Sequence, residues 1–300
     1  MIATKRLNAL LTAVALLAIA ACSDDAPPAD GALVVSVRPL ALIAREIAGD
    51  ELEVRELIRN GDPHHYAPSV SDRAMLERAA LVVWLGPGME SVLAKQLSQV
   101  PAERQLLLLE QGEYEMKGAA SGDPHVWLRP RNAAIIGAVM AERLALQYPG
   151  AAENFRRRAR DFSRQMANLQ KVLDRALWAY RDVPIVVTHD AYGHFFGNAG
   201  VVTSALGGSG GENRRGARTM LALGEVEDGC LFGEAPANDR DRQVAENLGL
   251  RYVALDPLGQ QLAGDARYTD LIQALLGDAR RCLGEVPDQT ADSAKDPDSQ

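Results

Sequence analysis

The chain has 300 residues, of which 47% are hydrophobic and 24% charged, and its formal net charge is −8 at pH 7. This composition is typical of a globular protein, and it excludes collagen-like, low-complexity and wholly disordered chains. The acidic balance and the 5% aromatic content argue against a nucleic-acid-binding protein. Phosphate contacts need clustered Lys and Arg, and stacking on bases needs aromatic side chains.

The N-terminus has the pattern of an export signal. Two basic residues precede an apolar run over residues 7–21, which is too short to span a bilayer comfortably. The run ends in the letters IAAC, which resemble the lipobox of bacterial lipoproteins. We therefore expect a signal peptide over 1–21, a lipid on Cys22 and a polar tether over 22–32; an ordinary signal peptide is the alternative. The predicted location is the periplasm or cell surface, with the protein anchored to a membrane by its lipid.

Strands and helices are predicted to alternate in a first lobe that covers residues 33–148. The apolar runs LVVWL and LLLL are typical of parallel strands buried on both faces. The expected strands cover residues 33–37, 52–58, 81–85 and 105–109, and the expected helices cover 40–48, 71–80, 91–99 and 132–147.

A long helix over residues 151–180, within a linking segment 149–181, is predicted to lead into a second lobe over 182–284 that repeats the alternation. Residues 285–300 are polar and acidic, and we expect them to be disordered. The pattern predicts an α/β fold of two βα lobes with parallel sheets, joined by one long helix. In the second lobe the expected strands are 185–187, 201–205, 230–232 and 252–255, and the expected helices are 191–198, 218–226, 239–248 and 268–282, with a Gly-rich loop before 218.

Two cysteines remain after the lipobox. Cys230 and Cys282 would lie in an oxidising compartment, which favours a disulfide between them. Closing a loop of about 52 residues would stabilise the fold by roughly 4 kcal/mol. A pair of buried free thiols is the alternative.

All five histidines fall in three short segments, at His64 and His65, at His125, and at His189 and His194. Two of these segments follow predicted strands, and ligands of open α/β sheets bind beyond the carboxyl ends of strands. A histidine in such a place can also be an ordinary hydrogen-bonded loop residue.

We favour His64, His125 and His189 as ligands of a metal ion. Asp256, which directly follows the last predicted strand, is the candidate fourth ligand. Three imidazoles and one carboxylate suit Zn2+ best. His65 and His194 are interpreted as residues behind the ligands or on the surface. The metal site is expected in the cleft between the lobes.

The same segments resemble a known family. PHHYAPSVSD, DPHVWLRPRNA, THDAYGHFFGNAGV and FGEAPANDRDRQVAENLGLRYVALDPLG resemble the cluster A-I metal-binding lipoproteins of ABC importers, and among them the zinc-uptake (ZnuA-like) proteins. The resemblance implies Zn2+ as bound cargo, with an ABC permease and its ATPase as partners. It also implies metal ligands at His64, His125 and His189, a ligand at Asp256 in some members, and a disulfide between Cys230 and Cys282.

The chain departs from the family pattern at several positions. Residues 111–122 are short and contain no His, whereas many zinc-binding members carry a His-rich loop there. Arg129 and His65 stand where Asp is common, His194 stands where Tyr is usual, and GGSGGENRRGA matches the family poorly. His189 occupies a position where manganese-binding members usually have Glu, which favours zinc because imidazole is the softer ligand.

Other functions make different demands on the sequence. A zinc-dependent hydrolase would need a general base beside an open coordination position, and the sequence contains no HExxH. A protein that binds cobalamin or an iron chelate would not need every histidine in strand-end loops. We therefore expect a monomeric extracytoplasmic solute-binding protein without enzymatic activity. A member of the same family that binds Mn2+ or another transition metal is the closest alternative.

Overall fold

A computed structural model describes residues 31–206 and 228–284. The predicted signal peptide, Cys22 with most of its tether, the Gly-rich loop with the helix over 218–226, and the tail over 285–300 lie outside the described residues. In the described part of the chain, no helix is both long and apolar enough to cross a membrane.

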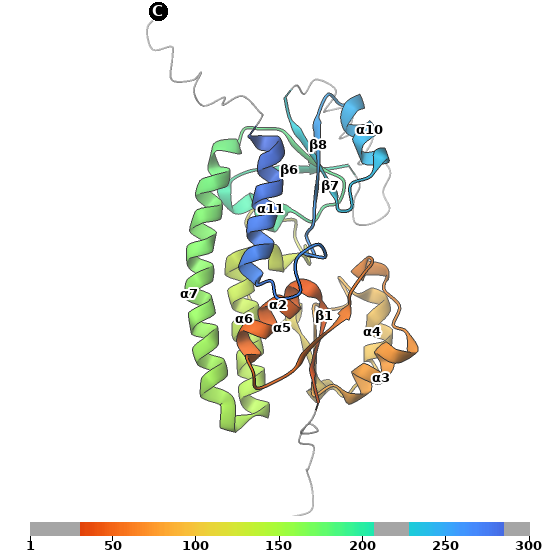
Figure 1. Ribbon diagram of the computed structural model, residues 1–300, viewed down its shortest axis with the longest axis vertical. Coiled ribbons are helices and arrows are strands. Elements are labelled where there is room, and N and C mark those ends of the chain that lie inside the picture. The colour runs from red at the N-terminus through yellow and green to blue at the C-terminus, as the bar shows by residue number, and fades with distance from the viewer. Residues whose placement is uncertain (1–30, 207–227, 285–300) are drawn as a thin grey trace, which may run out of the picture.

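The molecule consists of two lobes, each built on a four-stranded sheet (Figure 1). The strand orders are β2-β1-β3-β4 and β6-β5-β7-β8, and every described pair of neighbouring strands is parallel. The two sheets therefore share one topology, which confirms the predicted α/β fold. The strands are β1 (Leu33–Val37), β2 (Val54–Ile58), β3 (Leu81–Trp84), β4 (Gln105–Leu107), β5 (Ile185–Val187), β6 (Thr203–Ala205), β7 (Cys230–Glu234) and β8 (Arg251–Leu255).

Local sequence signals explain where several helices begin. Ser69 and Asp72 form a capping box at the start of α3, and Asn238 caps α10 by accepting the backbone N–H of Asp241. The helices are α2 (Arg38–Ala48), α3 (Val70–Arg78), α4 (Ser91–Leu97), α5 (Leu108–Gln111), α6 (Pro130–Gln147), α7 (Ala152–Leu177), α8 (Gly193–Phe196), α10 (Asp239–Asn247) and α11 (Tyr268–Leu283).

Helix α7 is the predicted long helix, and it runs beside both lobes (Figure 1). Its 26 residues span about 39 Å at 1.5 Å per residue. The buried positions recur every three or four residues, so one face packs on the protein and the charged residues remain outside. They are Phe155, Ala159, Phe162, Met166, Gln170, Leu173 and Leu177.

The two lobes are also tied together directly. The Trp127 indole N–H donates to the Pro257 carbonyl at 2.9 Å, and the Tyr268 hydroxyl donates to the Trp127 carbonyl. Trp127 comes from the first lobe, whereas Pro257 and Tyr268 come from the second. Because Trp127 and Tyr268 are fully buried, these bonds are shielded from water and fix the two lobes relative to each other.

A disulfide joins Cys230 to Cys282, with their Cα atoms 6.1 Å apart. It connects the first residue of β7 to the last helix, α11, and both cysteines are buried. The structure thus confirms the predicted pairing and closes a covalent loop over the second half of the second sheet.

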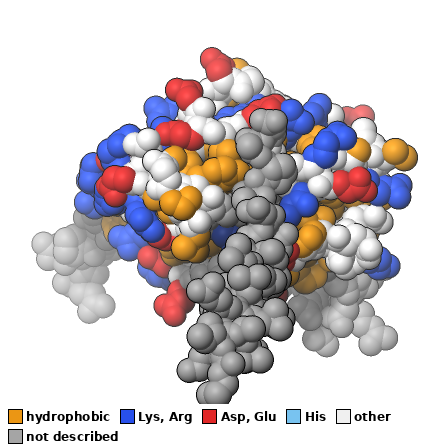
Figure 2. Space-filling view, turned by 90° about the horizontal axis from the view of Figure 1, so that it is seen from below, with side chains coloured by type: hydrophobic (Ala, Val, Ile, Leu, Met, Phe, Trp, Pro, Cys, Tyr) orange, Lys and Arg blue, Asp and Glu red, His pale blue; other side chains and the backbone are white. Residues whose placement is uncertain are grey.

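Charges of both signs are mixed on the surface. Figure 2 shows basic and acidic side chains interspersed with apolar ones at the end of the molecule that lies lowest in Figure 1. Exposed ion pairs such as Arg55–Glu53 and Arg156–Glu142 join charges of opposite sign on the surface. Such pairs contribute little to stability individually.

A carboxyl group is buried in the first lobe. Glu90 lies in the loop after β3 and accepts the backbone N–H groups of Leu85 and Gly86 at 3.1 and 2.9 Å. Burial raises the pKa of Glu90 to about 7, although these N–H groups act in the opposite direction. Its neighbour Met89 lines the pocket described below, so Glu90 fixes the loop that contributes this residue to the pocket.

We expect Glu90 to make the stability of the metal-free protein fall as the pH rises. Glu90 is protonated in both states at low pH, but between its unfolded pKa of about 4.5 and its folded pKa of about 7 only the unfolded state ionises. Over this range the wild type should lose up to about 3 kcal/mol of unfolding free energy relative to Glu90→Gln. Urea denaturation at pH 5 and pH 8 measures this difference.

The matched control is Glu77→Gln, because Glu77 is exposed on α3. The free energy of unfolding of Glu77→Gln should equal that of the wild type at both pH values. Parallel pH profiles for the wild type and Glu90→Gln would show that the carboxyl of Glu90 is ionised throughout.

Candidate metal centre

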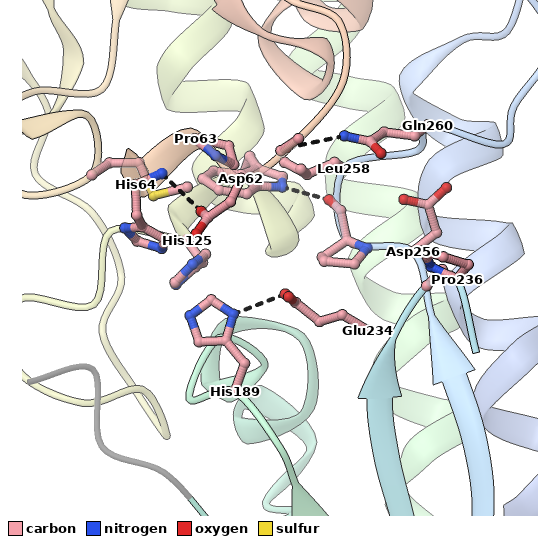
Figure 3. A pocket seen from close by; sticks show the side chains of 15 residues that line it. Asp62, Pro63, His64, His125, His189, Glu234, Pro236, Asp256, Leu258 and Gln260 are labelled. Atoms are coloured by element: carbon pink, nitrogen blue, oxygen red, sulfur yellow. Dashed lines mark hydrogen bonds and ion pairs between the residues drawn. The ribbon is translucent and has the colours of Figure 1, made fainter. Parts of the chain in front are cut away.

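Three histidines from both lobes converge in a pocket of about 310 Å³ (Figure 3). His64 follows β2, His125 precedes a short 3-10 turn before α6, and His189 follows β5. Their ring centroids are 4.9 to 5.6 Å apart, and one nitrogen from each ring lies within 4.8 Å of the other two. Within residues 31–206 and 228–284, this is the group of His, Cys, Asp and Glu side chains placed to hold a metal ion.

The buried nitrogens of this cluster are available to a ligand. The Nε2 atoms of His64 and His125 are both buried, and neither has a hydrogen-bond partner in the described part of the chain. A buried nitrogen without a partner costs about 1–3 kcal/mol. Coordination of a metal ion would remove this cost, because each nitrogen would then have a partner.

Two of the three histidines belong to an Asp-Pro-His tripeptide, and in both the aspartate side chain holds the histidine backbone in the same way. Asp62 Oδ1 accepts the backbone N–H of His64 at 2.9 Å, and Asp123 Oδ1 accepts that of His125 at 2.9 Å. Both are turns in which an aspartate side chain accepts the N–H two residues later. Asp123 Oδ1 also bonds the Nδ1 of His125 at 2.7 Å, so the Nε2 of that ring faces the cluster.

A carboxylate orients the third histidine as well. Glu234, the last residue of β7, bonds the Nδ1 of His189 at 2.8 Å (Figure 3). Strands β5 and β7 are neighbours in the sheet, so His189 and Glu234 meet at its carboxyl edge, where open α/β sheets bind ligands. A carboxylate on the far nitrogen of a metal-binding imidazole fixes the ring and makes it a better ligand.

Two of the rings differ in their affinity for protons. Burial, together with the neighbouring His125 and His189, lowers the pKa of His64 despite the opposing effect of Asp62. Burial alone would also lower the pKa of His189, but the hydrogen bond and charge of Glu234 raise it. His64 is therefore neutral at neutral pH and is ready to coordinate, whereas His189 is the one of the two that protonates first as the pH falls.

The other predicted residues lie around this cluster. Asp256 lines the same pocket, but its Oδ2 accepts the Gln261 N–H at 2.8 Å and its carboxylate is not within the 4.8 Å group, so its role as fourth ligand stays a prediction. His65 is exposed and bonds Asp62. His194 is completely buried, which excludes the surface interpretation, and its Nε2 lies 3.3 Å from the Asp123 carbonyl.

Sequence reasoning missed the two carboxylates behind the ligands. Neither Asp123 nor Glu234 is among the candidate residues that the sequence predicts. The signal for Glu234 was its place at the end of an apolar strand, CLFGE, at the same sheet edge as His189. For Asp123, the repeat of Asp-Pro-His at two sites indicated a shared local structure.

The fold and the site define a two-lobed α/β protein with a candidate transition-metal centre between its lobes. Residues 33–281 match the family model described as zinc-uptake complex component A, periplasmic. The chain therefore belongs to this family.

Individual relatives agree with this assignment. The chain is 29% identical over 296 residues to the high-affinity zinc uptake system protein ZnuA of Yersinia pestis. The matched region covers 85% of this chain and 92% of the relative. The fold of this chain is similar to that of the laminin-binding protein Lmb of Streptococcus agalactiae, with a TM-score of 0.72 and 21% identity. The match covers 84% of this chain and 99% of Lmb. The fold is also similar to that of the Zn(II)-bound ZnuA-like domain of AdcA from Streptococcus pneumoniae, with a TM-score of 0.68, 21% identity and coverage of 84% and 98%.

Replacing Glu234 by Gln should lower the pKa of His189. The charge of Glu234 raises this pKa, and without that charge burial acts in the opposite direction. NMR titration of the histidine ring protons in the metal-free protein measures the change. Glu246→Gln, at an exposed position of α10, should leave the pKa of His189 unchanged. An unchanged value in Glu234→Gln would show that the hydrogen bond to His189 does not form.

Proposed function

We propose that this protein captures one Zn2+ ion outside the cytoplasm with His64, His125 and His189 and passes it to an ABC importer. The observation that carries the proposal is the convergence of three imidazoles, two of which, His64 and His125, have a buried nitrogen without another partner in the described part of the chain. Membership of the zinc-uptake family supports the same conclusion. The role is binding and delivery rather than catalysis.

The geometry suits an ion of the size of Zn2+. In a tetrahedral site with Zn–N bonds of about 2.0–2.1 Å, ligand nitrogens lie about 3.3 Å apart. The three nitrogens now lie within 4.8 Å of one another, so small movements of the rings suffice for coordination. Water or the carboxylate of Asp256, in the wall of the same pocket, would complete the shell.

The donor set favours zinc over manganese. Three imidazole nitrogens make a compact, near-tetrahedral shell, whereas Mn2+ prefers more oxygen ligands. Both carboxylates that contact the ligand rings, Asp123 and Glu234, are hydrogen-bonded to the far nitrogens. They support imidazole ligation and do not replace it.

The proposed partners and location rest on sequence and family. An ABC permease with its ATPase would receive the ion, and a lipid on Cys22 would anchor the protein to the membrane. Relatives such as AdcA of Streptococcus pneumoniae are described as zinc-binding lipoproteins, which supports the anchor. Metabolic labelling with a palmitate analogue, compared between the wild type and Cys22→Ala, tests it.

The purified protein should bind one Zn2+ per chain, and His125→Ala should weaken binding by about 100-fold or more, because each ligand bond supplies a large share of the binding free energy. Chelator competition and metal analysis measure affinity and stoichiometry. His65→Ala is the control, since His65 neighbours His64 in the chain but is exposed and outside the cluster. Unchanged affinity in His125→Ala would remove His125 from the ligand set.

Zinc affinity should fall steeply below about pH 6, because protonated imidazole does not coordinate a metal. The onset should be set by His189, whose pKa Glu234 raises, while His64 resists protonation to lower pH. Zinc affinity measured from pH 7.5 to pH 5 tests this expectation. A flat profile would indicate a site made mainly of carboxylates.

A further inference from the structure

A short strap from the first lobe lies against helix α8 of the second lobe, next to the histidine cluster. We define the strap as residues 115–123. The contact is made through backbone: a Cβ on Gly118 would lie 2.3 Å from the Cα of Gly197, and a Cβ on Gly197 would lie 2.5 Å from the Cα of Gly118. At Gly193, a Cβ would lie 2.7 Å from the Cα of Ala119. Only glycine permits so close an approach of two backbones.

Arg129 holds the strap from its buried side through hydrogen bonds. Its side chain is completely buried and donates to the carbonyls of Glu115 at 2.8 Å and of Lys117, and to the carbonyl of His194 in α8 at 3.4 Å. One guanidinium thus bonds both sides of the contact, which its planar fork of five donors allows. On the surface, Lys117 Nζ adds a bond to the Asn198 carbonyl at 3.0 Å.

Each of the two segments that meet in this contact lies close in sequence to a candidate metal ligand. The strap ends at Asp123, whose carboxylate holds the ring and the backbone N–H of His125. Helix α8 begins four residues after His189. The strap and α8 thus join the two segments that carry His125 and His189, whose ring centroids are 4.9 Å apart.

We propose that the strap, docked through Gly118 and Gly197 and held by Arg129, is a positioning element that sets the distance between His125 and His189 before a metal ion arrives. This inference rests on the proposed metal-binding function. Its consequence is that Zn2+ enters a site that is already assembled across the lobes, so binding energy is not spent on bringing the lobes together.

The test uses a matched pair of glycine substitutions, one in the strap and one outside it. Gly118 and Gly200 have φ values of +77° and +86°, so alanine brings left-handed backbone strain at both positions. Only at Gly118 does the new Cβ meet the second lobe, at Gly197, because nothing lies within 4 Å of a Cβ at Gly200. Gly118→Ala should weaken Zn2+ binding by about 10- to 100-fold, as losses of residues that support metal ligands do, whereas Gly200→Ala should not.

Gly197→Ala makes the same contact impossible from the other side, at a position with an ordinary φ of −70°. Its control is Gly277→Ala in α11, at a helical position where open space surrounds the new Cβ. The visible spectrum of bound Co2+ reports ligand geometry, and it should change in Gly118→Ala and Gly197→Ala but not in the controls. Melting temperatures separate these effects from a general loss of stability.

Hydrogen exchange of the wild type adds a measurement that needs no variant. The amides of the strap should be equally protected with and without Zn2+, because docking precedes binding. Strap protection that appears only with Zn2+, or wild-type affinity and Co2+ spectra in both contact variants, would overturn the inference. Failure of the wild type to bind Zn2+ at all would instead overturn the proposed function.

Discussion

The central constraint in this molecule is that the Nε2 atoms of His64 and His125 are buried without a hydrogen-bond partner in the described part of the chain. A polar atom in that state would normally find another partner or turn toward water. His64 and His125 are prevented from doing so because both are held at their backbone by aspartate turns, and the ring of His125 is fixed by Asp123 as well. These contacts keep the two nitrogens in an arrangement that a bound ion would satisfy.

The identical topology of the two sheets places this arrangement between the lobes. In the second sheet, the ends of the neighbouring strands β5 and β7 carry His189 and its partner Glu234. The neighbouring strands β1 and β3 occupy the equivalent place in the first sheet, and there the loop after β3 buries Glu90 on its own backbone amides. The same position thus carries a proposed metal ligand in one lobe and a buried carboxyl that bonds its own loop in the other.

Most of the fold and the core of the site could be predicted from the sequence, because both depend on local patterns. Apolar runs marked the strands, and the grouping of histidines after strand ends pointed to His64, His125 and His189. The supporting groups could not be predicted in this way. Arg129 looked like a departure from the family, and its burial beneath the strap depends on contacts between segments far apart in sequence, such as the bond to the His194 carbonyl.

The disulfide has a topological consequence for the durability of the pocket. Glu234, Asp256, Pro257 and Gln260 all line the pocket and all lie between Cys230 and Cys282. With Ala235, Pro236 and Leu258, seven of the 15 lining residues therefore belong to one covalent ring. A protease that cuts the chain once inside this ring opens a loop but releases no fragment, since both pieces stay joined through sulfur. In a compartment where proteases act, a nicked molecule can keep its pocket wall in place.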